Sequence, residues 1–177
     1  MTRKIKLYIA ISLDGKIADS DGGVAWLDEL SHPEGEDYGY ADFYASIDTT
    51  LMGYNTYAKI EGFEVPFPYP DKKNYVFTRQ TDRPKSEQVE FVSNDIPDFV
   101  RTLKQQAGQD IWLVGGGEIN KLLIDQNLLD EIHIFIMPII LGDGISLLAS
   151  GVNRTKLRLK QEKTYENGAL SLIYEVL

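Results

Sequence analysis

The sequence predicts an α/β fold with a mainly parallel central sheet flanked by helices and a C-terminal antiparallel hairpin. Strand patterns alternate with helical patterns up to about residue 137. An apolar run at 111–114 passes through three glycines directly into a helical pattern. Alternating residues at 157–160 and 169–176 flank an Asn-Gly turn, which is typical of a hairpin.

The first half of the chain is expected to hold two strands and two helices. Residues 6–11 are an apolar strand, and the Asp- and Gly-rich segment 19–23 is a loop. Residues 36–47 carry large apolar side chains at helical spacing, which predicts a helix. A short strand at 49–52 ends at a glycine, and a second helix covers 56–60. Three prolines make 61–70 a loop.

The second half continues the alternation. Strands are predicted at 75–78, 89–92 and 131–137, and a helix at 96–106. The glycine-linked strand and helix lie between this helix and the strand at 131–137. His133 alternates with two isoleucines on the last of these strands, so it is expected to face outward or toward a partner. The chain shows no repeat, linker or low-complexity tract, which predicts a single domain over 1–177.

Composition excludes several classes of function. The formal net charge is −9, which opposes binding to nucleic acid or to an anionic membrane. There are no cysteines and only two isolated histidines, so no disulfide, thiolate catalyst or metal site is expected. No apolar stretch is long enough for a membrane span or a signal peptide, so a cytoplasmic protein is expected.

Four loops are expected at the carboxyl ends of the strands, where open α/β sheets bind ligands: 12–17, 53–56, 78–79 and 115–119. The glycine turn leaves backbone N–H groups bare at a helix start, which suits a phosphate or pyrophosphate. The alternative is that the glycines serve packing alone. The turn matches neither the Rossmann fingerprint nor the Walker loop.

These loops, taken in order, resemble the dihydrofolate reductase fold. They resemble more closely the reductase domain of bifunctional riboflavin-biosynthesis proteins and its stand-alone relatives. The resemblance covers nearly the whole chain. It is carried by Ala-Ile-Ser-Leu-Asp-Gly-Lys-Ile-Ala at 10–18, Met-Gly-Tyr-Asn-Thr-Tyr at 52–57, Val-Gly-Gly-Gly-Glu-Ile-Asn at 114–120 and Pro-Ile-Ile-Leu-Gly-Asp-Gly at 138–144.

The resemblance implies NADPH as hydride donor. It implies that backbone groups of Ala10 and Ile17 hold the nicotinamide carboxamide; the alternative is that both are core residues. It also implies that two turns bind the pyrophosphate of the cofactor and form a cradle. The first turn comprises Gly53, Asn55 and Thr56, and the second Gly115, Gly116, Gly117, Glu118 and Ile119. A cis peptide bond is expected between Gly115 and Gly116, and for the first turn the alternative is a helix capped by a side chain.

One departure concerns the ribose phosphate of NADPH. Dihydrofolate reductases usually carry Arg or Lys where this chain has Tyr54, and a 2′-phosphate needs a cation or several N–H donors. The next candidate is Arg79, which follows Thr78 in the family's adenosine-phosphate loop. Its alternative is a solvated loop arginine. Further cations that could contribute are Lys59, Lys72 and Arg83.

Three polar residues are candidates for the catalytic site. The resemblance to dihydrofolate reductases puts a substrate-orienting carboxylate close to Asp37, in the first long helix. The alternative is a helix-end carboxylate. Asp14 and Lys16 are the other polar groups expected beside the nicotinamide, and Asp14 is equally a turn residue.

The function expected is an NADPH-dependent reductase of a heterocyclic small molecule, a pteridine or an aminopyrimidine. The riboflavin version reduces the ribosyl group of a phosphorylated aminopyrimidine, and dihydrofolate reductase activity is its alternative. A nucleotide-binding module without turnover, or an interaction protein that binds no NADPH, is the alternative from another class. From kinship, a homodimer formed through the hairpin at 157–176 is expected.

Overall fold

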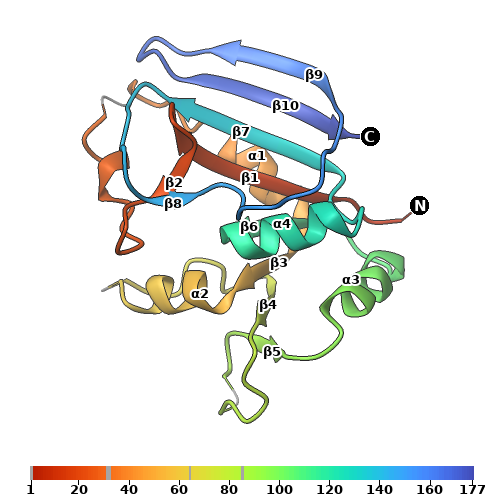
Figure 1. The fold of residues 1–177 in the computed structure, drawn as a ribbon. Coiled ribbons are helices and arrows are strands. Elements are labelled where there is room, and N and C mark those ends of the chain that lie inside the picture. Colours follow the sequence, from red (N-terminus) through yellow and green to blue (C-terminus); the bar gives the residue numbers. More distant parts are fainter. Residues whose placement is uncertain (1, 31–32, 64, 85) are drawn as a thin grey trace.

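An eight-stranded sheet runs through the middle of the protein in the computed structural model, which describes residues 2–30, 33–63, 65–84 and 86–177. The strand order is β5-β4-β3-β6-β1-β7-β10-β9 (Figure 1). Neighbours from β5 to β7 are parallel, whereas β10 is antiparallel to β7 and β9, which confirms the predicted fold class. The strands are β1 (Ile5–Ser12), β3 (Ile47–Gly53), β4 (Lys73–Phe77), β5 (Glu90–Val92), β6 (Asp110–Gly115), β7 (Glu131–Met137), β9 (Leu157–Thr164) and β10 (Leu170–Val176).

The centre of the parallel region is buried on both faces. A parallel sheet covered on both sides needs strands that are apolar along nearly their whole length. Leu7 of β1 lies between Leu113 of β6 and Ile132 of β7, and Leu7 and Leu113 are fully buried. Burying one such side chain contributes about 1.5–3 kcal/mol. These central strands therefore form the rigid frame for the loops at their ends.

Helices cover both faces of this frame. On one face lie α3 (Ile96–Gln105) and α4 (Gly117–Asp125), and on the other α1 (Tyr40–Ala45) and α2 (Tyr54–Glu61). The faces are opposite because successive residues of a strand point to opposite sides: Leu113 belongs to the first cluster, and the tryptophan before it to the second. No helix in the described part of the chain is long and apolar enough to cross a bilayer.

The first helix is shorter than predicted. The sequence predicts a helix over 36–47, but α1 spans only Tyr40–Ala45. Tyr38 and Gly39 have φ angles of 57° and 79°, a left-handed conformation that cannot continue an α-helix. At the other end, Ile47 already pairs in β3. The residues before 40 therefore form turns rather than helix.

A second, two-stranded sheet escaped prediction. Its strands, β2 (Lys16–Ala18) and β8 (Ile145–Ser146), pair antiparallel. Strands of three and two residues are too short to show a period in the sequence. This small sheet connects the turn after β1 to the segment that follows β7, at the carboxyl edge of the parallel sheet.

The strand β9 forms one margin of the large sheet, and all its residues are exposed. Its side chains alternate between leucine and basic residues at the start, with Leu157 and Leu159 43% and 45% exposed. A bare edge strand of this length is a template for pairing with another chain.

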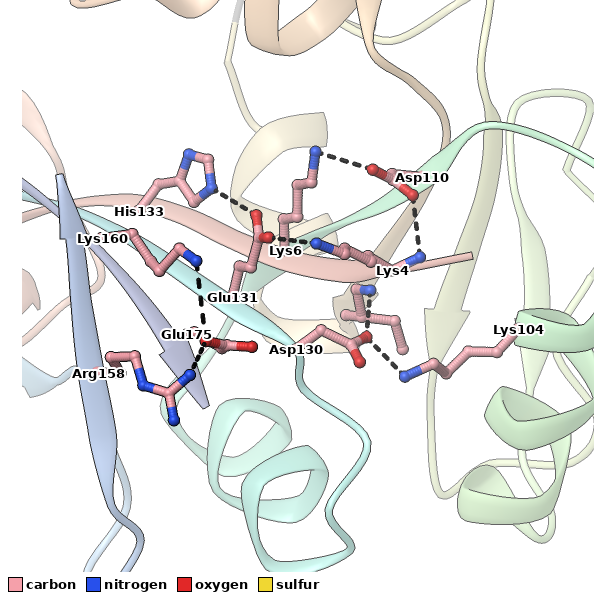
Figure 2. A network of polar contacts seen from close by, with 11 residues as sticks. Lys4, Lys6, Lys104, Asp110, Asp130, Glu131, His133, Arg158, Lys160 and Glu175 are labelled. Atoms are coloured by element: carbon pink, nitrogen blue, oxygen red, sulfur yellow. Dashed lines mark hydrogen bonds and ion pairs between the residues drawn. The ribbon is translucent and has the colours of Figure 1, made fainter. Parts of the chain in front are cut away.

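Charged side chains fasten the amino ends of the central strands (Figure 2). Lys4 Nζ lies 2.7 Å from Glu131 Oε1, which joins the residue before β1 to β7. Lys6 Nζ lies 2.8 Å from Asp110 Oδ2, which joins β1 to β6. This network stands at the end of the sheet opposite to the loops predicted to bind a ligand.

His133 belongs to this network and does not face outward. Its Nε2 lies 3.2 Å from Glu131 Oε2, and its side chain is only 15% exposed (Figure 2). The ring packs near those of Tyr8 and Phe43. The expected outward orientation is wrong because α1 covers this face of the sheet with aromatic side chains.

Candidate active site

The four predicted loops lie along one edge of the parallel sheet. Residues 13–15 follow β1, Tyr54 follows β3, Thr78 follows β4 and Gly116 follows β6. These strands are consecutive in the sheet, in the order β4-β3-β6-β1 (Figure 1). Loops that are far apart in the sequence therefore line up at the carboxyl ends of the strands, where open α/β sheets bind their ligands.

Two helices begin at this edge without a side-chain cap. The residues before α2 and α4 are Gly53 and Gly116, and no side chain there caps the helix. The first N–H groups of a helix have no acceptor within it and lie at the positive end of its dipole. An anion between the two helix starts would meet the backbone donors of Tyr54, Asn55, Gly117 and Glu118.

The two helix starts are in direct contact. The Thr56 hydroxyl donates a hydrogen bond to the carbonyl oxygen of Gly115 at 3.3 Å. A Cβ atom on Gly116 would lie 3.1 Å from Thr56 Oγ1, and one on Gly53 would lie 3.2 Å from Ile119 Cγ1. The structure thus brings together five of the predicted cradle residues, from two segments 50 or more residues apart in the chain.

The peptide bond between Gly115 and Gly116 is trans, so the expectation of a cis bond there is wrong. The chain turns instead through positive φ angles of 121° at Gly115 and 97° at Gly116. Residues with a Cβ rarely adopt this conformation. Both positions therefore require glycine for backbone geometry, whatever the ligand.

The third glycine is a packing residue. A Cβ on Gly117 would lie 2.6 Å from the carbonyl oxygen of Ser146. The Gly117 carbonyl in turn accepts a hydrogen bond from the Ala149 N–H at 3.1 Å. The packing alternative considered for the glycine turn thus holds for Gly117, whose missing side chain makes room for the segment after β8.

Asn120 lies behind the cradle and was not singled out from the sequence. It is fully buried in α4, and its Nδ2 donates to the Leu147 carbonyl at 2.9 Å. Its Oδ1 has no hydrogen-bond partner among the described residues and would lie 3.4 Å from a Cβ on Gly115. An unpaired buried oxygen costs about 1–3 kcal/mol. The sequence offered one signal for Asn120, which is a polar residue at a position where the helical pattern predicts burial.

Ala10 and Ile17 lie on either side of the turn after β1, and both are partly buried. β1 pairs with β7 as far as Ser12 but with β6 only as far as Leu7. The margin of β1 that faces β6 is therefore open at Ala10. Unpaired backbone groups at such a margin can hydrogen-bond an amide.

Asp14 fastens two loops together. Its Oδ1 accepts hydrogen bonds from the Ser12 hydroxyl at 2.6 Å and from the Leu141 N–H at 3.0 Å. Its Oδ2 accepts the N–H of Gly142 at 2.8 Å. These donors, the Ser12 hydroxyl first, lower the pKa of Asp14 to about 2. The carboxylate stays ionised and orients the turn.

Lys16 supplies a positive charge at the same turn. Its backbone N–H donates to Ser12 Oγ at 2.9 Å, and its Nζ lies 3.2 Å from Ser146 Oγ. Within the described residues no carboxylate forms an ion pair with this ammonium group. Its charge is therefore available to an anionic ligand.

Asp37 has different surroundings from Asp14 and Lys16. It precedes α1 and is exposed, and its carboxylate accepts the N–H groups of Gly39 at 2.8 Å and Ala41 at 2.9 Å. These backbone donors, Ala41 first, lower the pKa of Asp37. Protonating a substrate near neutral pH calls for a raised pKa. The environment of Asp37 is that of a helix-end carboxylate.

The loop after β4 carries two arginines in different surroundings. Arg79 is exposed and makes no ion pair within the described ranges. Arg83 is partly buried, and its guanidinium carbon lies 3.4 Å from the centroid of the Tyr54 ring. Thr78, at the start of the loop, is buried and accepts the Nε–H of Arg83 at 3.3 Å.

Comparison with known proteins gives the family. The sequence profile of the RibD C-terminal domain matches residues 69–171, more than half of the chain. The chain belongs to the RibD C-terminal domain family. RibD-type domains are riboflavin-pathway reductase-like, so the predicted kinship is confirmed, and the family supports an oxidoreductase.

The chain is also similar to individual proteins along nearly its whole length. The uncharacterized protein YwjB of Bacillus subtilis (strain 168) is 44% identical over 166 residues, 93% of this chain and 94% of that protein. A structure from Shewanella sp. PV-4, named for riboflavin biosynthesis, has a TM-score of 0.88 at 25% identity and covers 100% of this chain and 99% of that one. Dihydrofolate reductase from Enterococcus faecalis, complexed with NADP(H) and RAB-propyl, has a TM-score of 0.67 at 13% identity, covers 99% of both chains, and shares the fold.

Proposed function

We propose that this protein is an NADPH-dependent reductase of a riboflavin-pathway aminopyrimidine of the 5-amino-6-(5-phosphoribosylamino)uracil type. The observation that carries the proposal is the contact between the two uncapped helix starts, at α2 and α4. Their backbone donors can serve both phosphates of a pyrophosphate. Membership in the RibD C-terminal domain family supplies the class of reaction.

The strand order, with the nicotinamide at β1 as the resemblance implies, supports one direction for the cofactor. With the pyrophosphate between the two helix starts, the nicotinamide extends toward β1, where backbone groups of Ala10 and Ile17 bind its carboxamide. The adenosine half extends the other way, toward β4 and β5, and meets Thr78 and Arg79.

Each group of the chain has a task in the reduction. NADPH, when bound, supplies the hydride. In the proposed reaction the ribosyl carbon that carries the amino nitrogen would accept this hydride and its bond to the ring oxygen would break. That oxygen would take up one proton from water, which gives a ribityl chain. Lys16 binds the substrate phosphate, and Asp14 keeps the turn that carries Lys16 in place.

The alternative, dihydrofolate reductase activity, needs a carboxyl group that orients and helps to protonate a pterin. Asp37 was the candidate for this task. Its lowered pKa and its two backbone hydrogen bonds favour a structural role. The aminopyrimidine is therefore the favoured substrate.

The test is oxidation of NADPH with each substrate in turn, with NADPH binding measured in parallel. We expect turnover with the phosphoribosylaminouracil and none with dihydrofolate, and a raised KM for Lys16→Gln because a phosphate contact is lost. Binding without oxidation of either substrate would make the protein a nucleotide-binding module. Failure of the folded protein to bind NADPH would leave an interaction protein.

We also propose that two copies pair through β9, the exposed margin of the sheet. Antiparallel pairing of two copies of this strand would give its free N–H and C=O groups partners and cover Leu157 and Leu159. Sedimentation should show a dimer for the native chain and for the surface control Val65→Asp, and a monomer for Leu159→Asp. A native monomer at micromolar concentration contradicts the pairing.

A further inference from the structure

The indole of Trp112 stands where the pairing of β1 with β6 ends. The two strands are neighbours in the sheet (Figure 1). Their pairing stops at Leu7 and Leu113, although β1 continues to Ser12 and pairs with β7 all the way. Trp112 Nε1 donates a hydrogen bond to the carbonyl oxygen of Tyr8 at 3.2 Å. A side chain of β6 thus binds the main chain of β1 just beyond the last backbone pair.

The backbone of Ala10 lies on the same margin of β1 as this carbonyl. Backbone groups of successive residues in a strand point to opposite neighbours. The Lys4 carbonyl accepts an N–H from β6, and the next carbonyl, of Ile5, accepts the N–H of the residue before β7. Every second residue from Lys4 onward therefore faces β6, which includes Tyr8 and Ala10. Trp112 occupies the Tyr8 carbonyl, and the backbone of Ala10 is left open toward β6 in the described part of the chain.

The indole takes the place of a backbone donor. A regular parallel ladder advances by two residues on each strand. Starting from the bond between the Ile111 N–H and the Lys4 carbonyl, it would bring the N–H of Gly115 to the carbonyl of Tyr8. Instead Trp112 binds this carbonyl, and β6 shifts its register against β3 just before Gly115 and ends there. The glycine turn can therefore leave the sheet without orphaning a carbonyl of β1.

Aromatic rings hold the indole of Trp112 from several sides. It is only 6% exposed, and it packs edge-to-face, the arrangement that aromatic rings prefer. The ring centroids of Tyr69, Phe43 and Tyr40 lie 5.0, 5.5 and 5.9 Å from that of the indole, at interplanar angles of 71°, 89° and 70°. Because the indole cannot turn without displacing these rings, its N–H fixes the course of β1 two residues before Ala10.

We propose that Trp112 is a positioning residue for the nicotinamide end of the cofactor. The inference rests on the proposed function, in which backbone groups of Ala10 bind the carboxamide. By ending the ladder one step early, the indole keeps β6 away from Ala10 and leaves a slot with fixed margins between the two strands. The adenosine half extends toward β4 and β5, on the other side of β6. The effect of Trp112 should therefore be confined to ligands that carry the nicotinamide.

The test compares, by calorimetry, the affinity for NADPH with that for 2′-phospho-ADP-ribose, which lacks the nicotinamide. Trp112→Phe removes the N–H donor but keeps an aromatic ring. It should weaken NADPH binding about tenfold, as expected when a buried carbonyl loses its hydrogen bond and the slot its fixed margin, and leave the binding of 2′-phospho-ADP-ribose unchanged. Phe43→Leu is the matched control, because it removes a ring that packs on the indole and leaves the hydrogen bond in place. It should lower the melting temperature without changing the ratio of the two affinities.

The native protein gives a second readout that does not depend on a folded variant of Trp112. The chain has two tryptophans, so a nitrogen–proton correlation spectrum contains two indole signals, and Trp26→Phe assigns them. NADPH should shift the Trp112 signal and slow the hydrogen exchange of its indole N–H. The fragment without nicotinamide should do neither.

Equal weakening of both ligands by Trp112→Phe would show a merely structural role. An unchanged affinity for NADPH, or a Trp112 signal that NADPH leaves in place, would also overturn the inference. If NADPH binding depends on Trp112 as expected but no substrate is reduced, the positioning role stands and the reductase proposal fails. If the native protein binds neither ligand, both fail.

Discussion

The carboxylate of Asp14 accepts a hydrogen bond from the backbone N–H of Leu141 at 3.0 Å, across 127 residues of sequence. The next N–H, that of Gly142, bonds to its other oxygen at 2.8 Å. The Asp-Gly-Lys turn after β1 and the Leu-Gly-Asp-Gly segment after β7 are thus two halves of one contact. This contact holds the turn that carries Lys16, the proposed phosphate ligand.

Replacing Asp14 with asparagine should lower the melting temperature at neutral pH. Because the folded pKa of Asp14 is about 2, below the ordinary 3.8, its carboxylate stabilises the fold above pH 3.8, and this contribution is lost as the pH falls toward 2. Thermal unfolding of both proteins across this range should show a difference that shrinks on acidification. A difference that stays constant with pH contradicts the assignment.

Asp37→Asn should leave the rate of NADPH oxidation unchanged, because asparagine keeps one oxygen that can accept a backbone N–H group and no proton is drawn from this residue. Asp37→Ala should lower stability by removing those acceptors. Steady-state rates and urea unfolding of the two variants separate the roles. Loss of turnover in a stable Asp37→Asn protein would restore the catalytic interpretation.

Gly117→Ala should destabilise the fold by about 1–3 kcal/mol, because overpacking forces backbone to move. The new Cβ would lie 2.6 Å from the Ser146 carbonyl oxygen, which is main chain and cannot rotate away. Gly62→Ala is the matched control, since its φ is −76° and its Cβ would meet its neighbours at 3.4 Å or more. Urea unfolding should give a clearly lower free energy of unfolding for Gly117→Ala than for Gly62→Ala. Equal values would show that Ser146 and the segment after it can shift.

His133 should make the fold less stable in mild acid. Burial lowers its pKa below 6.5, and this outweighs the opposing effect of Glu131. As the pH falls below 6.5 the unfolded chain takes up a proton before the folded one does, so stability falls until the folded pKa is reached. The free energy of unfolding should therefore drop less in His133→Gln than in the native protein between neutral and mildly acidic pH. If the free energy of unfolding changes with pH in the same way in both proteins, the imidazole is protonated to the same extent in the folded and the unfolded chain, which contradicts the prediction.

Much of the architecture could be predicted from local patterns. The strands expected at 6–11, 111–114 and 131–137 correspond to β1, β6 and β7, because burial on both faces leaves a run of apolar residues in the sequence. The alignment of the four loops could also be predicted, because the carboxyl ends of parallel strands lie at the same edge of a sheet. The short strands β2 and β8 left no such pattern.

Individual residues of the site show what composition and spacing cannot decide. Asp37 was expected inside a helix, but two left-handed residues delay the helix until Tyr40. Gly117 was expected in the cofactor cradle, with packing as the alternative, and only the structure shows that a side chain there would meet the Ser146 carbonyl oxygen. Arg83 was one of several cations in the sequence, and only its contact with the ring of Tyr54 distinguishes it from Arg79.

The sequence by itself therefore determined the fold class, the family and the loops that line the carboxyl edge of the parallel sheet, since each can be inferred from neighbouring residues and their periodicity. The tertiary structure decided which carboxylates brace loops, which glycine serves packing and which arginine is positioned. Those roles depend on contacts between residues far apart in the chain, and the distances that create them exist only once the sheet has assembled.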